Sequence, residues 1–295
     1  MIHFYELARL STDQRIRLMR RAEIQIDELI EYVRPIVQAV RERGDEALVE
    51  FTARFDHVQL APEQLRVSRE EIERAHQLLD RSVYEAIQHA IRNVRAFHER
   101  QMPHELWFTE VAPGVMAGEK ITAITSVGLY VPRGKGAFPS VMYMLATPAN
   151  IAGVPRIVVC TPPGPDGSVD PASLVAADLC GVHEIYRLGG AQAIAALAYG
   201  TATIEPVHKI TSPGSGYIAA AKRLLYGTVD VGLPAGPSES ITLADASADP
   251  ELLARDLIIE AEHGPDSSSL LVTDDRPLAE EVMARLPQNI AALPE

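Results

Sequence analysis

The stretch from residue 184 to residue 200 reads EIYRLGGAQAIAALAYG, and it decides the fold. Its first five residues are β-rich, two glycines follow, and residues 192–199 are helix formers with apolar side chains. This order predicts a strand, a tight turn and a helix. A strand followed at once by a helix is one half of a βαβ unit, so the stretch predicts a parallel sheet.

The same alternation continues on both sides of this stretch. Strands are predicted at residues 127–131 and 156–160, and helices at 140–153 and 172–181. After residue 234 the pattern resumes, with strands at 240–244 and 269–273 and a helix at 250–263 between them. The expected fold class is therefore α/β, with Rossmann-like parallel βαβ units.

The first 100 residues read as helices instead. Thr12 and Asp13 are suited to cap a first helix, and Pro35 is expected to kink or split the next one. Ser68 followed by Glu71 fits a capping box that opens one long amphipathic helix reaching residue 98. A final amphipathic helix is expected from residue 277, followed by an apolar tail.

Composition narrows the class of protein. The chain has 295 residues, 47% of them hydrophobic, which excludes a disordered or fibrous protein and makes two domains the natural expectation. Its net charge of −13 argues against a nucleic-acid partner. No signal peptide is recognisable, and the apolar runs are too short to span a membrane, so we expect a cytoplasmic protein. Its two cysteines, Cys160 and Cys180, are expected to be reduced and buried.

Three loops rich in small residues follow predicted strands. They are the glycine pair at 189–190, TSPGSG at 211–216 and AGPSES at 235–240. The glycine pair fits an anion site at a helix N-terminus or a plain turn, and the dinucleotide fingerprint GxGxxG is absent. Together the three loops fit an α/β ligand crevice. Ser238 lies outside a GxSxG context and suits a substrate-orienting hydroxyl better than a nucleophile.

Glu260 and His263 form the pair most suggestive of chemistry. Residues three apart share a helix face, and a Glu-x-x-His pair can hold a metal. The alternative is a solvated acidic helix end, and two ligands do not complete a zinc site. Tyr130, at the end of a predicted strand, suits either a ligand contact or a core aromatic.

Five stretches together resemble the histidinol dehydrogenase family. They are VRERGDEAL at 40–48, GLYVP at 128–132, the stretch 189–200, AGPSE at 235–239 and AEH at 261–263. They occur in family order from about residue 25 to the end of the chain. The resemblance implies a zinc-dependent enzyme that uses NAD to oxidise an amino alcohol to the acid through an aldehyde.

The resemblance also implies roles for individual residues. Tyr130 and Gln192 match positions that contact NAD, and Ser238 matches a serine that contacts the substrate. His263 matches a residue that binds both zinc and the substrate.

Two positions depart from the family pattern. Glu260 stands where the family has a glutamine that binds zinc and substrate, so it adds a negative charge to that site. Ser215 stands where the family has an asparagine that contacts NAD. The loop at 133–140 also differs, and it brings Arg133 and Lys135 near the expected cofactor crevice. These departures fit a paralogue with a different alcohol substrate, such as a sulfopropanediol dehydrogenase-like enzyme.

The resemblance also implies how the domains are arranged. Residues 1–128 are expected to form the helical part of a first domain, with 129–233 an inserted Rossmann-like domain and 234–295 the incomplete return of the first. The family's catalytic Glu-His pair, its other zinc ligands and the segment that crosses over in its homodimer lie beyond residue 295. No residue here is therefore assigned as the general base.

Three other functions stay open. The chain could be a paralogue that oxidises another small polar alcohol, such as a sulfonated diol. It could also be an inactive fragment that binds a nucleotide or a partner protein. A third possibility is a different zinc enzyme that completes its metal site across an oligomer.

We predict that the purified 295-residue chain does not turn over an alcohol, because it lacks the base and part of the zinc site. Formation of NADH, followed by absorbance with zinc, NAD and histidinol present, is the measurement. Robust reduction of NAD would overturn this prediction.

Overall fold

The computed structural model describes residues 2–19, 26–133, 136–232, 238–261 and 267–293. Its contacts divide the chain into two units. The larger unit is Ile26–Ala235, and the smaller unit combines Met1–Gln25 with Gly236–Glu295. Each unit is described by itself.

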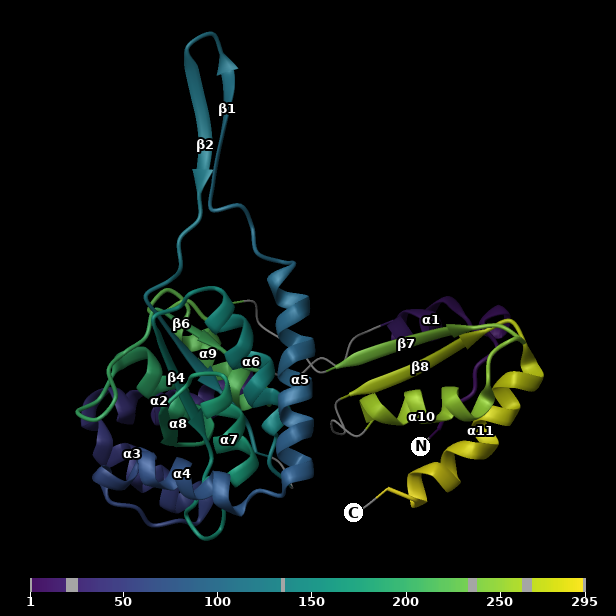
Figure 1. Cartoon of the computed structure of the whole chain (residues 1–295). Helices are drawn as coiled ribbons and strands as arrows, with labels where there is room; N and C mark the ends of the chain where they lie inside the picture. The colour runs from purple at the N-terminus through teal and green to yellow at the C-terminus, as the bar shows by residue number, and fades with distance from the viewer. Residues whose placement is uncertain (1, 20–25, 134–135, 233–237, 262–266, 294–295) are drawn as a thin grey trace. The chain divides into compact units, whose positions relative to one another are not determined.

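The larger unit is built on a parallel sheet (Figure 1). The order of its strands is β5-β4-β3-β6. The strands are β3 (Ser126–Tyr130), β4 (Arg156–Thr161), β5 (Glu184–Arg187) and β6 (Lys209–Thr211). Helices α6 (Pro139–Ile151), α7 (Pro171–Leu179) and α8 (Gly190–Tyr199) connect them, and α9 (Gly216–Leu225) follows β6. The predicted α/β class with parallel βαβ units is confirmed.

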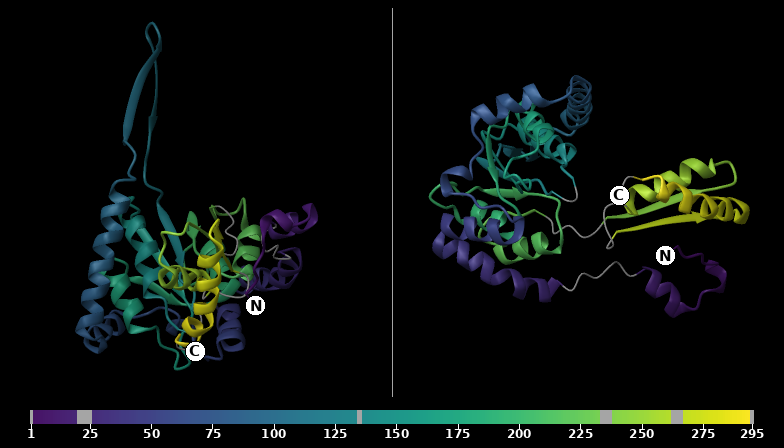
Figure 2. Two further views of the ribbon diagram at one scale, coloured as in Figure 1. Left: turned by 90° about the vertical axis from the view of Figure 1, so that its right-hand side faces the viewer. Right: turned by 90° about the horizontal axis from the view of Figure 1, so that it is seen from below.

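Helices cover both faces of this sheet (Figure 2). Alternate residues of a strand point to opposite faces, and Leu129 and Tyr130 of β3 accordingly belong to different hydrophobic clusters. Tyr130 shares its cluster with residues of α2 (Ile26–Arg43), α3 (Asp45–Phe51), α8 and α9. Leu129 shares the other with residues of α4 to α7. Both cysteines are buried and free, as expected.

The expected long helix after Ser68 is wrong: the structure has two helices, α4 (Arg69–Leu78) and α5 (Arg81–Glu99). Leu79 is extended, with ψ near 130°, and Asp80 is the residue before the second helix, a position that aspartate favours. The capping box is confirmed, because Ser68 Oγ accepts from the Glu71 backbone N–H and the Glu71 carboxylate accepts from the Ser68 backbone N–H.

Helix α2 continues through Pro35 without a break, so this proline does not split the helix. It ends before Gly44, whose φ of 55° favours glycine, and α3 begins at Asp45. A π-helical turn, η2 (Thr52–Asp56), extends α3. Short 3₁₀ turns, η1 (Leu7–Arg9) and η3 (Pro62–Gln64), complete the N-terminal part.

A β-hairpin that the sequence did not suggest projects from the larger unit (Figure 1). It consists of β1 (Leu106–Ala112) and β2 (Val115–Lys120), paired antiparallel around a turn at Gly114. Both strands are exposed along their whole length, apolar side chains included, and Phe108 is 62% exposed.

The smaller unit contains one further parallel pair of strands. Strand β7 (Glu239–Ala244) leads through α10 (Pro250–Ala261) to β8 (Ser268–Thr273), and α11 (Arg276–Ala291) follows. Leu253 and Leu257 of α10 pack with Val282 of α11 in a separate core. The predicted strand, helix, strand and final helix are all present, and α1 (Thr12–Met19) belongs to the same unit.

The unit boundary after residue 25 differs from the expected boundary at residue 128. The reason is packing: Val33, Ile36 and Val37 of α2 are buried in the same cluster as α8 and α9. The expectation that residues 1–128 and 234–295 form one domain stays a prediction. Within the described part of the chain, every helix is too short or too polar to cross a membrane.

Glu71→Ala should destabilise the chain by about 2 kcal/mol, because the Glu71 carboxylate caps α4 and also pairs with Arg187. Arg187 Nη2 lies 2.8 Å from Oε1 and 2.6 Å from Oε2 of this carboxylate. Burial raises the pKa of Glu71, but hydrogen bonds from Ser68 and Arg187 outweigh it, so the pKa is lowered. The stabilisation is therefore present above the unfolded-state pKa, about 4.3, and is lost as pH falls through the folded value.

Urea unfolding at pH 7 and pH 3.5 measures this effect. Glu73→Ala is the control, because Glu73 pairs with Arg69 at 3.4 Å on an exposed surface, where an ion pair contributes under about 1 kcal/mol. Equal losses for the two variants at pH 7 would contradict the prediction.

Candidate functional site

The strand order creates a switch point at the carboxyl edge of the sheet. The chain runs from β3 to β4 to β5 in one direction and then places β6 on the other side of β3. The helices after β3 and β5 therefore leave on opposite faces, and in open α/β sheets such a point is where ligands usually bind. Residues that directly follow these strands are the first candidates for ligand contacts.

Tyr130 is the last residue of β3, and 4% of its surface is exposed. Its phenol oxygen accepts a hydrogen bond from the Gly190 backbone N–H at 3.1 Å. Burial raises the pKa of Tyr130 to about 12, and the charge of Asp56 acts in the same direction. The phenol therefore stays protonated at neutral pH, and its O–H can donate to a ligand.

The glycine pair begins α8, and a side chain at either position would be crowded by its neighbours. Gly190 has φ near 61°, and a Cβ there would lie 2.6 Å from Gln192 Oε1. A Cβ on Gly189 would lie 3.0 Å from Pro162 and 3.1 Å from Asp56 Oδ1. The two glycines thus let three strand ends and the segment after α3 approach one another closely.

Gln192 is buried in the first turn of α8 with 1% of its surface exposed. Neither its amide nitrogen nor its amide oxygen has a hydrogen-bond partner among the described residues. Ser212 Oγ, just after β6, is likewise buried without a partner in the described part of the chain. Each such group costs about 1–3 kcal/mol. Ordered water or a ligand normally satisfies buried polar groups of this kind, which makes the switch point a candidate site.

Sequence reasoning missed two residues of this region. Asp56 ends η2, and its Oδ2 is buried without a partner among the described residues. Burial raises the pKa of Asp56 to about 6, against the opposing effect of His57. Lys222 of α9 is 6% exposed and donates to the Ser212 carbonyl at 3.3 Å, and burial lowers its pKa. Nothing in the local sequence distinguishes either residue from a surface charge.

Of the residues expected at the cofactor site, Tyr130 and Gln192 are brought together around Gly190. Ser215 is the exposed N-cap residue of α9, and its side chain makes no capping hydrogen bond. It follows β6, so it belongs to the same edge of the sheet, although no contact joins it to Gln192.

The residues expected to bind substrate and metal belong to the smaller unit. Ser238 is exposed directly before β7, and its carbonyl accepts from the Ser268 N–H at 3.1 Å. Glu260 lies in the last turn of α10, and His263 lies outside the described residues. Because α10 returns antiparallel to β7, Glu260 and Ser238 belong to the same end of this unit. Among the described side chains, no group of three His, Cys, Asp or Glu is arranged to hold a metal.

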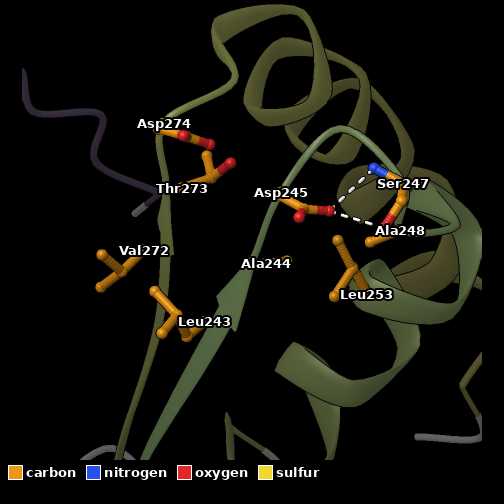
Figure 3. A pocket seen from close by; sticks show the side chains of 9 residues that line it. All are labelled: Leu243, Ala244, Asp245, Ser247, Ala248, Leu253, Val272, Thr273 and Asp274. Atoms are coloured by element: carbon orange, nitrogen blue, oxygen red, sulfur yellow. Dashed lines mark hydrogen bonds between the residues drawn. The ribbon is translucent and has the colours of Figure 1, made fainter.

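The opposite end of the smaller unit carries a pocket at the carboxyl ends of β7 and β8 (Figure 3). Asp245 lines it and accepts from the Ser247 backbone N–H at 2.9 Å and from the Ser247 hydroxyl at 2.6 Å. These bonds shape the turn before α10. None of the predicted site residues lines this pocket.

The fold and the cluster around Gly190 define an α/β protein with a candidate ligand site at a switch point of its sheet. The histidinol dehydrogenase family profile matches residues 19–295. The chain is 51% identical over 294 residues to a histidinol dehydrogenase homolog of Rhizobium meliloti (strain 1021), covering all of this chain and 64% of that protein. It is 51% identical over 294 residues to the histidinol dehydrogenase of Synechocystis sp., covering all of this chain and 68% of that protein.

A solved structure agrees. The crystal structure of histidinol dehydrogenase from Elizabethkingia anophelis superposes with a TM-score of 0.90 at 35% identity, over 97% of this chain and 65% of that one. The chain belongs to the histidinol dehydrogenase family, whose members are NAD-dependent oxidoreductases. It spans about two thirds of the length of these relatives.

Gly190→Ala should destabilise the chain more than Gly227→Ala. Both glycines have positive φ, 61° and 90°, so both alanines carry a backbone cost of about 1–2 kcal/mol. Only at position 190 must a Cβ also displace Gln192, whereas nothing lies within 4 Å of a Cβ at position 227. Urea unfolding of the two variants measures the difference. Equal midpoints would show that the contact with Gln192 carries no constraint.

Proposed function

We propose that this chain carries the NAD-binding part of a zinc- and NAD-dependent alcohol dehydrogenase of the histidinol dehydrogenase type. The observation that carries the proposal is the unpartnered amide of Gln192, buried at the switch point beside Gly190. The site also fits a dinucleotide, because the glycine pair lets a ligand approach the backbone of the turn closely.

When bound, NAD accepts a hydride, and zinc polarises the alcohol oxygen of the substrate. The residues of the chain supply binding and orientation. Tyr130 presents a protonated phenol, and Gln192 offers both a donor and an acceptor. Ser215, exposed at the start of α9, offers a shorter polar contact than an asparagine would.

We propose that the substrate and the metal are bound by Ser238, Glu260 and His263. A hydroxyl at position 238 would orient the alcohol. A carboxylate at position 260 and an imidazole at position 263 are both ordinary zinc ligands, and three residues of helix spacing let them share a face. The pair would supply two zinc ligands, and a zinc site takes three or four.

A paralogue with another small polar alcohol as substrate is the second candidate. Glu260, in place of a neutral amide, favours it, because an added negative charge alters which substrate charge the site accepts. A sulfonated diol and an amino alcohol are the two substrates to compare. The relatives at 51% identity carry both descriptions, histidinol dehydrogenase and histidinol dehydrogenase homolog.

The third candidate is a non-catalytic protein that binds a nucleotide at the same site. It differs from the proposed dehydrogenase only in that it oxidises no alcohol. For the full-length protein we further propose a cytoplasmic homodimer that takes a small-molecule alcohol and has neither nucleic-acid nor membrane partners. The net charge of −13 supports the absence of a nucleic-acid partner.

Gln192→Leu should weaken NAD binding at least about tenfold while leaving stability unchanged or higher. The substitution removes two buried amide atoms that lack partners in the described structure, so the free chain loses no hydrogen bond. A ligand that bonds this amide loses about 1.4 kcal/mol or more. Isothermal titration with NAD and thermal melting measure the two effects.

Gln77→Leu, on the exposed surface of α4, is the matched control and should change neither quantity. A lower melting temperature with unchanged NAD affinity would assign Gln192 a structural role. Absence of any NAD binding by the unsubstituted chain would remove the proposed function itself.

A further inference from the structure

Asp56 is a partly buried acidic group, and the proposed function provides no role for it. Asp56 is the last residue of η2, and its side chain lies beside the turn that begins α8. One carboxylate oxygen lies 3.1 Å from the position of a Cβ on Gly189. The other is buried and has no partner among the described residues.

The neighbours of Asp56 offer little compensation for its charge. Tyr130 responds to that charge electrostatically, and its phenol oxygen is already bonded to the Gly190 N–H. His57, the next residue in the chain, is the only group that lowers the Asp56 pKa among the causes of its shift. A carboxylate oxygen that is buried in such surroundings is costly unless something donates a hydrogen bond to it.

The N-terminus of α8 would ordinarily attract a phosphate, because its free N–H groups and helix dipole favour an anion. A carboxylate beside that terminus opposes a second anion, since like charges a few ångströms apart repel. Gln192, 1% exposed and unpartnered in the described chain, adds neutral polar groups to the same turn. The turn is therefore suited to a neutral group that carries hydroxyl donors.

We infer that Asp56 is a specificity-determining residue whose carboxylate accepts a hydrogen bond from a ribose hydroxyl of the dinucleotide, so that the phosphates lie away from the Gly189–Gly190 turn. This inference rests on the proposed function, because it assigns one contact within the proposed NAD site. Phosphate binding at the same turn is the alternative. The two arrangements predict opposite changes in NAD affinity when the charge of Asp56 is removed.

The test is isothermal titration of NAD at pH 8, where the carboxylate is ionised, into the 295-residue chain and its Asp56→Asn variant. A carboxylate that accepts from a ribose hydroxyl predicts at least about tenfold weaker binding for Asp56→Asn. A phosphate at the turn predicts tighter binding, because the variant removes a repulsive charge. Unchanged or tighter binding overturns the inference.

Thermal melting separates this role from a structural one. Asp56→Asn removes the charge of a partly buried carboxylate whose Oδ2 has no partner in the described chain, so the melting temperature should stay the same or rise. A fall in melting temperature accompanied by unchanged affinity would show a structural role and contradict the inference. Asp80→Asn, an equal change of charge at an exposed N-cap without a side-chain bond, is the control and should leave both quantities unchanged.

The unsubstituted chain distinguishes this inference from the proposed function. If it binds no NAD, the proposed function fails and this contact fails with it. If it binds NAD and Asp56→Asn binds equally well or more tightly, only the role of Asp56 is removed.

Discussion

A parallel sheet that must be buried on both faces is the constraint on which the larger unit depends. All five residues of β3 are buried, and the two directions of its side chains supply two separate hydrophobic clusters. One cluster needs α4 to α7, and the other needs α2, α3, α8 and α9. The N-terminal helices are therefore part of the core of this unit, because the sheet would otherwise leave one apolar face in water.

The same constraint places polar groups where nothing in the described chain satisfies them. At the carboxyl edge, the helices that cover the sheet bury the Gln192 amide and one carboxylate oxygen of Asp56. In a protein selected for stability alone, such groups would be paired or replaced by apolar ones. Their retention beside a glycine pair is consistent with a site in which binding recovers what folding leaves unsatisfied.

Much of the fold could be predicted from one sequence. The β-rich runs predicted strands of both parallel sheets, and Ser68 with Glu71 marked a helix start that the structure confirms. The break at Leu79 and the hairpin at residues 106–120 could not be predicted. An apolar periodicity that continues through Leu79 hides an extended residue. An exposed hairpin has no buried face to impose an alternating pattern.

The sequence by itself determined the fold class, the glycine turn at the start of α8 and the family, because these rest on local patterns and ordered motifs. It also pointed to Tyr130 and Gln192, through family resemblance. Only the tertiary structure decided that these two residues meet at Gly190 and that Asp56 joins them there. The reason is burial, which a local sequence pattern does not show. From the sequence, Asp56 is expected to be a surface charge, and only the folded chain shows that it is partly buried and that its pKa is raised.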